Sequence, residues 1–126
     1  MNWLRLLALL QGIYYAASGL WPLLHMPSFL AVTGPKQDVW LVNTVGVLVC
    51  VIAGVLLFAA VRRAVVPEVR LLGAGSAAAL ASIEFYYGMT GKIWPVYLLD
   101  GVLELILVLL WAVLWFRGYG KSISST

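Results

Sequence analysis

The chain has 126 residues, of which 63% are hydrophobic and 10% are charged, and its formal net charge is +3. Its mean hydropathy of +1.01 lies far above that of a soluble domain of this length. This composition excludes a soluble globular protein and predicts an integral membrane protein surrounded by a lipid bilayer.

Four apolar stretches are each long enough to cross a hydrocarbon core of about 30 Å, which takes about 20 helical residues. They lie near residues 3–24, 40–61, 69–87 and 94–116. Their apolar residues are continuous rather than alternating, which favours helices over a barrel, and helices satisfy their own backbone hydrogen bonds in lipid. The sequence therefore predicts an all-α membrane protein, a bundle of four transmembrane helices that forms one domain over residues 1–126.

The connection between the first two helices, residues 25–39, is longer than the others. Pro27 can start a helical turn and Gly34-Pro35 can end it. These residues predict a short amphipathic segment on the outer surface of the bundle. Such a segment covers one end of the bundle, either as a lid over a site or as a shield for the helix ends.

Basic residues are distributed unequally between the two ends of the predicted bundle. Six fall on one side and two on the other: Arg5, Arg62, Arg63, Arg70, Arg117 and Lys121 against Lys36 and Lys92. Because Lys and Arg favour the cytoplasmic side, both termini are predicted to be cytoplasmic. Anchoring of helix ends also explains the basic pI of about 9.2, so no nucleic-acid partner is expected.

The six tryptophans fit the same topology. Aromatic side chains with a polar edge gather at the two membrane interfaces. The outer set is predicted to be Trp21, Trp40 and Trp94, and the inner set Trp3, Trp111 and Trp115.

Three carboxylates lie inside the predicted spans: Glu84 in the third, and Asp100 and Glu104 in the fourth. An ionisable group in hydrocarbon costs several kcal/mol, so such residues usually face the bundle interior and serve a function. At about 1.5 Å per residue, Asp100 and Glu104 lie about 9 and 15 Å below Trp94, and one helical turn apart. Glu84 is on a helix of opposite direction at a depth close to that of Asp100. We expect the three carboxylates to converge.

Other polar groups fall at matching depths on the four helices. We expect them to act as hydrogen-bond partners of the acids rather than as reactive groups: Gln11, Tyr15, Asn43 and Tyr97. The third helix also has a face of small residues, Gly73, Ala77 and Ala81, that leads to Glu84. Such faces let helices approach closely, which favours an interior position for Glu84.

Two carboxylates one turn apart in a low-dielectric interior cannot both ionise cheaply, and no Lys or Arg is expected at their depth. They either share protons or wait for an external cation. The functional interpretation is a site for a proton, a cation or a cationic, lipophilic small molecule, with proton-coupled transport as one form of it. The structural alternative is a protonated hydrogen-bond network that fixes helix register.

Two other classes of function stay open. The acids could pair with a basic residue of a partner helix, in an accessory or assembly protein. They could also act as acid and base in a small membrane enzyme. Cys50 and His25 are isolated, so no metal-ligand set, haem or other cofactor is predicted. A homo-oligomer or a membrane partner protein is compatible with the small-residue faces.

Residues 9–42 carry a series of short motifs: Gln11-Gly12, Gly19-Leu20-Trp21-Pro22, Pro27, Phe29, Gly34-Pro35-Lys36, Asp38 and Trp40-Leu41-Val42. In these motifs and in its overall layout, the chain resembles small uncharacterised bacterial inner-membrane proteins of the DoxX-like type. The resemblance implies four helices and a bacterial inner membrane, and it implies no activity, because that group has none in common. By layout alone the chain is also similar to the emopamil-binding-protein group, which adds an isomerase-like activity on a lipophilic substrate to the enzyme alternative.

Overall fold

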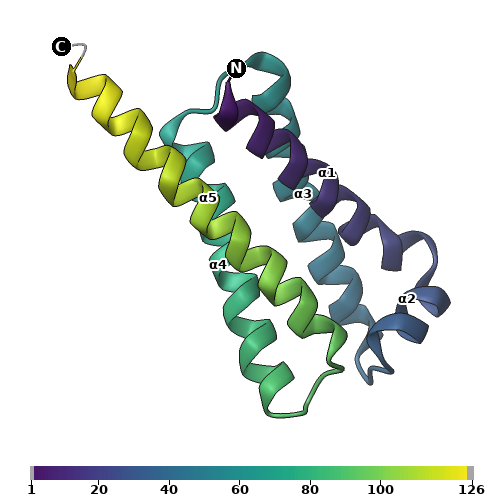
Figure 1. The fold of residues 1–126 in the computed structure, drawn as a ribbon. Helices are drawn as coiled ribbons and strands as arrows, with labels where there is room; N and C mark the ends of the chain where they lie inside the picture. Colours follow the sequence, from purple (N-terminus) through teal and green to yellow (C-terminus); the bar gives the residue numbers. More distant parts are fainter. Residues whose placement is uncertain (1, 125–126) are drawn as a thin grey trace.

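The computed structural model describes residues 2–124, with side chains as far as Arg117, and this part of the chain is all-helical (Figure 1). The helices in chain order are α1 (Trp3–Leu24), α2 (Met26–Thr33), α3 (Val39–Arg62), α4 (Pro67–Met89) and α5 (Val96–Ser124). The predicted all-α fold is confirmed. Lys121, counted above among the basic residues of one side, lies on α5, but its side chain is outside the described ones.

Three segments of the described chain are long and apolar enough to cross a membrane: α1, α3 and Val96–Arg117 of α5. The fourth long helix, α4, does not reach the same apolar level. Residues 73–79 of α4 are all Gly, Ala or Ser, which are small and only weakly hydrophobic. The lower hydropathy of α4 thus comes partly from residues suited to helix packing and partly from its charged residues Glu68, Arg70 and Glu84.

The helix ends follow from local chemistry. The Asn2 side chain accepts a hydrogen bond from the Arg5 N–H and caps α1. Pro67 occupies the first turn of α4, where its missing N–H costs nothing. Gly34, with a φ of 99°, ends α2 in a backbone conformation that favours glycine.

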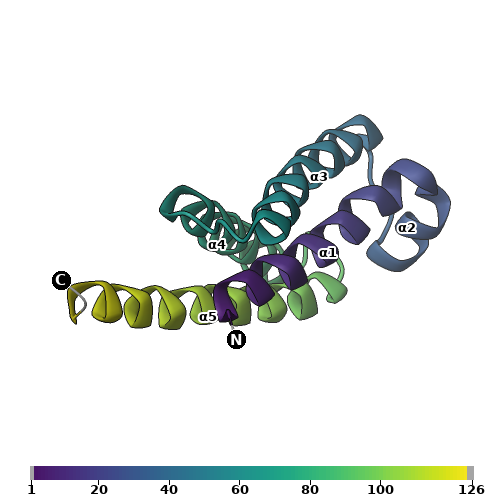
Figure 2. The ribbon, with the colours of Figure 1, turned by 90° about the horizontal axis from the view of Figure 1, so that it is seen from above.

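The long helices form two pairs. The most extensive contacts join α1 to α3 and α4 to α5, whereas contacts between the pairs are fewer. The two views show the pairs side by side at an angle, with α2 folded against one end of α1 (Figures 1 and 2). We call this end the α2 end of the bundle. Because α2 also contacts α5, it bridges the two pairs there.

Glycines set the spacing within the helix pairs. A Cβ at Gly19 of α1 would lie 2.7 Å from the Gly46 carbonyl oxygen of α3, and one at Gly46 would lie 2.8 Å from the Gly19 carbonyl oxygen. The predicted small face of α4 is buried as expected, from Gly73 through Ala77 and Ala81. Close backbone approach of this kind is typical of helix packing in membranes.

The solid core lies at the end opposite α2. It consists of buried residues from α1, α3 and α5 and from the α3–α4 connection: Leu7, Ala8, Leu56, Ala59, Ala60, Val65 and Trp111. Trp111, which was predicted to lie toward the inner interface, is only 1% exposed, so its side chain packs within the protein. Its Nε1 donates a hydrogen bond to Gln11 Oε1 at 2.6 Å, which offsets the cost of burying the indole N–H.

Candidate functional site

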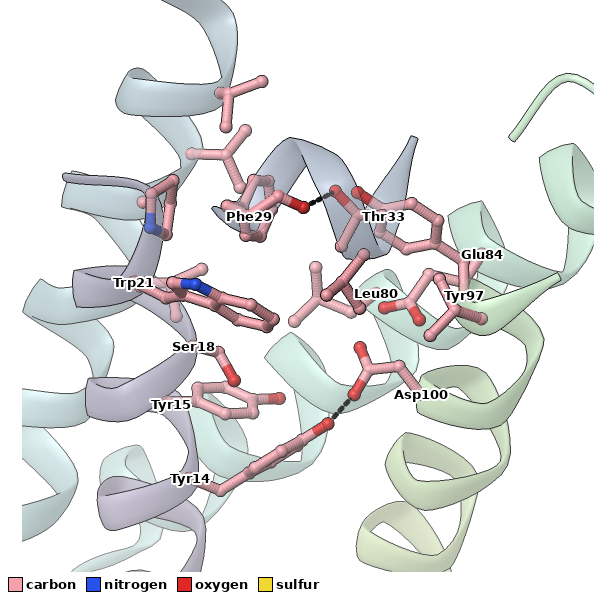
Figure 3. A pocket seen from close by; sticks show the side chains of 18 of the residues that line it. Tyr14, Tyr15, Ser18, Trp21, Phe29, Thr33, Leu80, Glu84, Tyr97 and Asp100 are labelled. Carbon is pink, nitrogen blue, oxygen red and sulfur yellow. Dashed lines mark hydrogen bonds between the residues drawn. The ribbon is translucent and has the colours of Figure 1, made fainter. Parts of the chain in front are cut away.

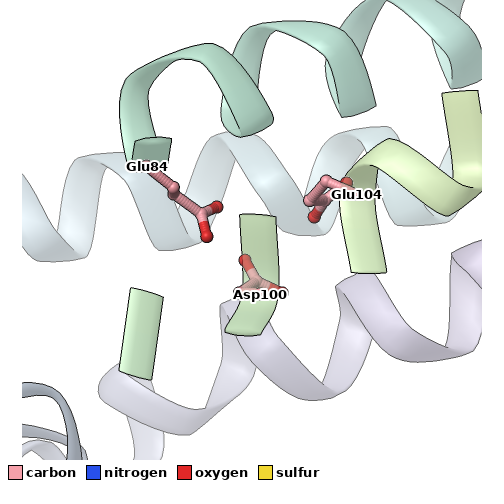
Figure 4. A group of neighbouring side chains, drawn as sticks. All are labelled: Glu84, Asp100 and Glu104. Carbon is pink, nitrogen blue, oxygen red and sulfur yellow. The ribbon is translucent and has the colours of Figure 1, made fainter. Parts of the chain in front are cut away.

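The three carboxylates converge near the α2 end, as predicted (Figure 4). Glu84 comes from α4, and Asp100 and Glu104 from successive turns of α5. One oxygen from each lies within 4.8 Å of the others. Glu84 is 5% exposed and Glu104 is 1% exposed, while Asp100 is half-buried. We refer to these three residues as the carboxylate cluster.

Two consecutive tyrosines of α1 reach the cluster from the other helix pair. Tyr15 O–H donates to Glu104 Oε2 at 2.6 Å, and Tyr14 O–H donates to Asp100 Oδ1. Tyr15 was predicted as a partner of the acids, but Tyr14 was not. Successive residues of a helix point about 100° apart, so Tyr14 falls outside the single polar stripe that includes Tyr15. It still reaches an acid because Asp100 and Glu104 lie one turn apart on α5, so each of the two adjacent tyrosines meets a different carboxylate.

Glu84 has no such donor. Its Oε2 is buried, and among the side chains the structure describes it is the buried oxygen without a hydrogen-bond partner. A buried polar atom without a partner costs about 1–3 kcal/mol, and more if it is charged. The arrangement thus holds one acceptor ready for a donor or a cation.

The carboxylate cluster borders a cavity of about 450 Å³ between the two helix pairs (Figure 3). Side chains of Glu84 and Asp100 point into it from one pair, and Tyr14, Tyr15 and Ser18 approach from α1. The remaining walls are mainly apolar and come from all five helices: Gly19, Trp21, Pro22, Phe29, Val32, Leu41, Val42, Val45, Gly46, Val49, Leu80 and Val96. The cavity is therefore an apolar chamber with acidic groups along one wall.

Lys36 also lines this cavity, together with Thr33 and Tyr97. Its ammonium donates to Thr33 Oγ1 at 2.9 Å and to the Gly34 carbonyl oxygen at 3.0 Å. It lies 5.2 Å from the ring centroids of both Phe29 and Tyr97, a cation–π geometry. Residues 26–36 fold over the α2 end and so bring this lysine from the loop to the wall of the cavity that the acids also line.

The other predicted supporting residues lie in different places. Tyr97 lines the cavity one turn before Asp100. Gln11 is fully buried deeper in the bundle, where its Nε2 donates to the Gly73 carbonyl oxygen at 3.0 Å and its Oε1 accepts from Trp111. Asn43 is exposed on α3 and is not among the cavity residues, so the structure does not bring it to the carboxylate cluster.

The arrangement can hold positive charge. Three ionised carboxylates this close in a low-dielectric interior repel one another strongly, unless protons or a cation lie among them. A span of 4.8 Å between oxygens is about twice a calcium–oxygen distance, so the cluster fits a hard metal ion as well as an ammonium group. Comparisons of the chain with protein-family models, curated proteins and solved structures found no match.

Proposed function

We propose that this chain is an integral membrane protein that binds a cation at Glu84, Asp100 and Glu104 in exchange for protons. The Oε2 atom of Glu84, a residue of the cavity wall, carries the proposal, since no hydroxyl, amide or ammonium group of the described residues donates to this buried acceptor. Two tyrosine hydroxyls supply two donors for three acids. The cluster therefore holds protons when empty and releases at least one when a cation enters.

The first prediction concerns this exchange. Calorimetric titration of the protein in lipid nanodiscs with Ca²⁺, Mg²⁺ and an organic ammonium, in buffers of different ionisation enthalpy, measures affinity and proton release together. We expect Glu84→Gln to weaken binding of the accepted cation about tenfold or more, because a hydrogen bond to a charged group contributes about 1.5–3 kcal/mol. We expect Asp100→Asn to reduce proton release.

Two exposed acids provide matched controls. Glu68→Gln lies on α4 with Glu84, and Asp38→Asn removes a carboxylate at the start of α3. Both controls should bind as the original protein does. If Glu68→Gln weakened cation binding as much as Glu84→Gln does, the effect would come from general surface charge. If none of the three cations bound to the protein, the proposal would be refuted.

The proposed topology has four membrane spans, with α4 as the third, and cytoplasmic termini in a bacterial inner membrane. The burial of the small-residue face of α4 supports it, because a helix packed on its neighbours needs less hydrophobic surface toward lipid. The excess of basic residues at the end opposite α2 supports the orientation. The motifs of residues 9–42 support a relationship to DoxX-like proteins.

The second prediction tests this topology by cysteine labelling. In a Cys50→Ala background, single cysteines replace the exposed Gln37, Ala64 and Thr90. A membrane-impermeant maleimide should label positions 37 and 90 in intact cells and position 64 only after permeabilisation. If α4 does not cross the membrane, positions 64 and 90 will react on the same side.

A second candidate function is an enzyme that acts on a lipophilic substrate. It requires a chamber between Glu84 and Asp100, and the cavity of about 450 Å³ favours it. One acid would donate a proton and another accept one, as in an isomerase-like reaction. Deuterium transfer from solvent into a bound alkene, lost in Glu84→Gln, would favour this candidate over simple binding.

The accessory alternative receives less support. Pairing with a partner helix needs acids on the lipid-facing surface, and Glu84 and Glu104 are buried within the chain. A transport path between protomers, or a membrane partner for the exposed apolar faces, stays compatible with cation binding.

A further inference from the structure

We propose that the cation is an organic ammonium with an apolar body, which occupies the cavity and places its charged group at Glu84. This inference rests on the proposed function, since it needs the carboxylate cluster to accept a cation. It adds the chemical class: a monovalent amine of small-molecule size in place of a bare metal ion.

The size of the chamber is the first reason. Its volume of about 450 Å³ lies within the range of about 300–1,000 Å³ that is typical of small-molecule sites. A metal ion at the carboxylates would fill a small part of this space. Val42, Val45 and Val49 of α3 and Leu80 of α4 line the rest, and an apolar ligand body matches such walls.

The second reason is the set of ligand atoms. A calcium ion takes six to eight oxygens, and magnesium demands a near-ideal octahedron. Tyr14 and Tyr15 each donate to one oxygen, on Asp100 and Glu104 respectively, which leaves fewer lone pairs for a metal ion. An ammonium group needs only up to three acceptors, which the free Glu84 Oε2 and its neighbouring carboxylates can supply.

Lys36 is the third reason, because it shows how this cavity holds an ammonium group. Its Nζ lies between the Phe29 and Tyr97 rings and donates to oxygens of Thr33 and Gly34. Aromatic faces attract an ammonium through their quadrupole, whereas they cannot complete the oxygen shell of a hard metal ion. These aromatic and oxygen groups already hold the Lys36 ammonium, which would repel a second positive charge at the α2 end, so the charged group of the ligand belongs at Glu84.

The test compares one amine with its neutral isostere and with metal ions. The probes are 4-phenylbutylamine, 4-phenylbutan-1-ol, CaCl₂ and MgCl₂, titrated calorimetrically into the protein in nanodiscs, with empty nanodiscs as the partition blank. Val49→Phe fills the apolar part of the cavity, and Val47→Phe, exposed on the same helix and not a cavity residue, is its matched control. Both variants are first compared with the original protein by circular dichroism and size-exclusion chromatography.

We expect the amine to bind about tenfold or more tightly than the alcohol, a difference that Glu84→Gln removes. Val49→Phe should weaken amine binding about tenfold, and Val47→Phe should change it less than about twofold. Equal binding of amine and alcohol, or an amine affinity that Val49→Phe leaves unchanged, would overturn the inference.

The metal ions separate this inference from the proposed function. Glu84-dependent binding of Ca²⁺ or Mg²⁺ without amine binding would refute the amine class and leave cation binding at the cluster intact. Absence of Glu84-dependent binding for all charged probes would refute both.

Discussion

Gly19→Ala is expected to destabilise the protein by about 1–3 kcal/mol or more, the usual cost of overpacking a well-packed interior. The added methyl would lie 2.7 Å from the Gly46 carbonyl oxygen and 2.8 Å from Cys50 Sγ. A backbone oxygen cannot rotate away as a side chain can, so α1 and α3 must separate. Since these helices form the most extensive contact of the fold, their separation affects the whole pair.

Gly54→Ala is the matched control on α3. A Cβ at Gly54 meets no atom within 4 Å, and alanine is favoured over glycine inside a helix by about 0.5–1 kcal/mol. This variant should therefore be as stable as the original protein or more stable. The two substitutions are chemically identical and are predicted to have opposite signs.

The measurement is unfolding by sodium dodecyl sulfate in mixed micelles, followed by circular dichroism. Gly19→Ala should unfold at a lower detergent fraction than Gly54→Ala. The double variant with Gly46→Ala should lose less than the sum of the two single losses, because one separation of the helices relieves both contacts. Equal midpoints for Gly19→Ala and Gly54→Ala would show that α1 and α3 are not in close contact at Gly19 and Gly46.

Two features of the fold could be predicted from the sequence: the helices, because they form from local apolar runs, and the burial of the carboxylates, because their exposure to lipid costs much free energy. Continuous apolar runs predict helices in lipid, and α1 covers the residues expected for the first of them. The convergence of Glu84, Asp100 and Glu104 follows from the cost of exposing a carboxylate to hydrocarbon, together with their depth along two antiparallel helices. The small face of α4 could be predicted for the same kind of reason, since only close packing explains it.

Positions that depend on which helices pair, and at what rotation, could not be predicted. Asn43 has the right depth, but α3 turns this residue outward when it presents Gly46 to α1. Trp111 packs over Gly73, where a Cβ would come within 2.6 Å of its ring, and its depth alone did not predict this burial. Lys36 reaches the cavity because of the path that α2 takes over the end of the bundle. The residues of α2 predict a short helix but do not specify that path.

Trp111→Ala should lower the free energy of unfolding by about 3 kcal/mol. This is the low end of the range for truncating a large buried aromatic residue, because hydrophobic transfer contributes little between helices in lipid. Its side chain is 1% exposed and belongs to the solid core with Leu7 and Leu56. Trp111→Phe keeps most of the ring contact and removes the Nε1 donor, so it should cost about 1–2 kcal/mol through the unpartnered Gln11 Oε1. Trp40→Ala, at a side chain 66% exposed, should change stability little.

The position of this tryptophan explains why the loss should extend beyond one helix. Its hydrogen bond joins α5 to Gln11 of α1, and Gln11 in turn bonds to the Gly73 carbonyl of α4, so three helices from both pairs meet at one point. Tyr15 lies one turn along α1 from Gln11 and bonds to Glu104, which places the carboxylate cluster directly on this joint. Trp111→Ala should therefore weaken cation binding as well as lower the unfolding midpoint, whereas Trp111→Phe should lower the midpoint alone. If Trp111→Ala and Trp40→Ala unfolded at the same midpoint, Trp111 would not hold the two helix pairs together. The tyrosine–carboxylate hydrogen bonds would then be the remaining connection between the pairs.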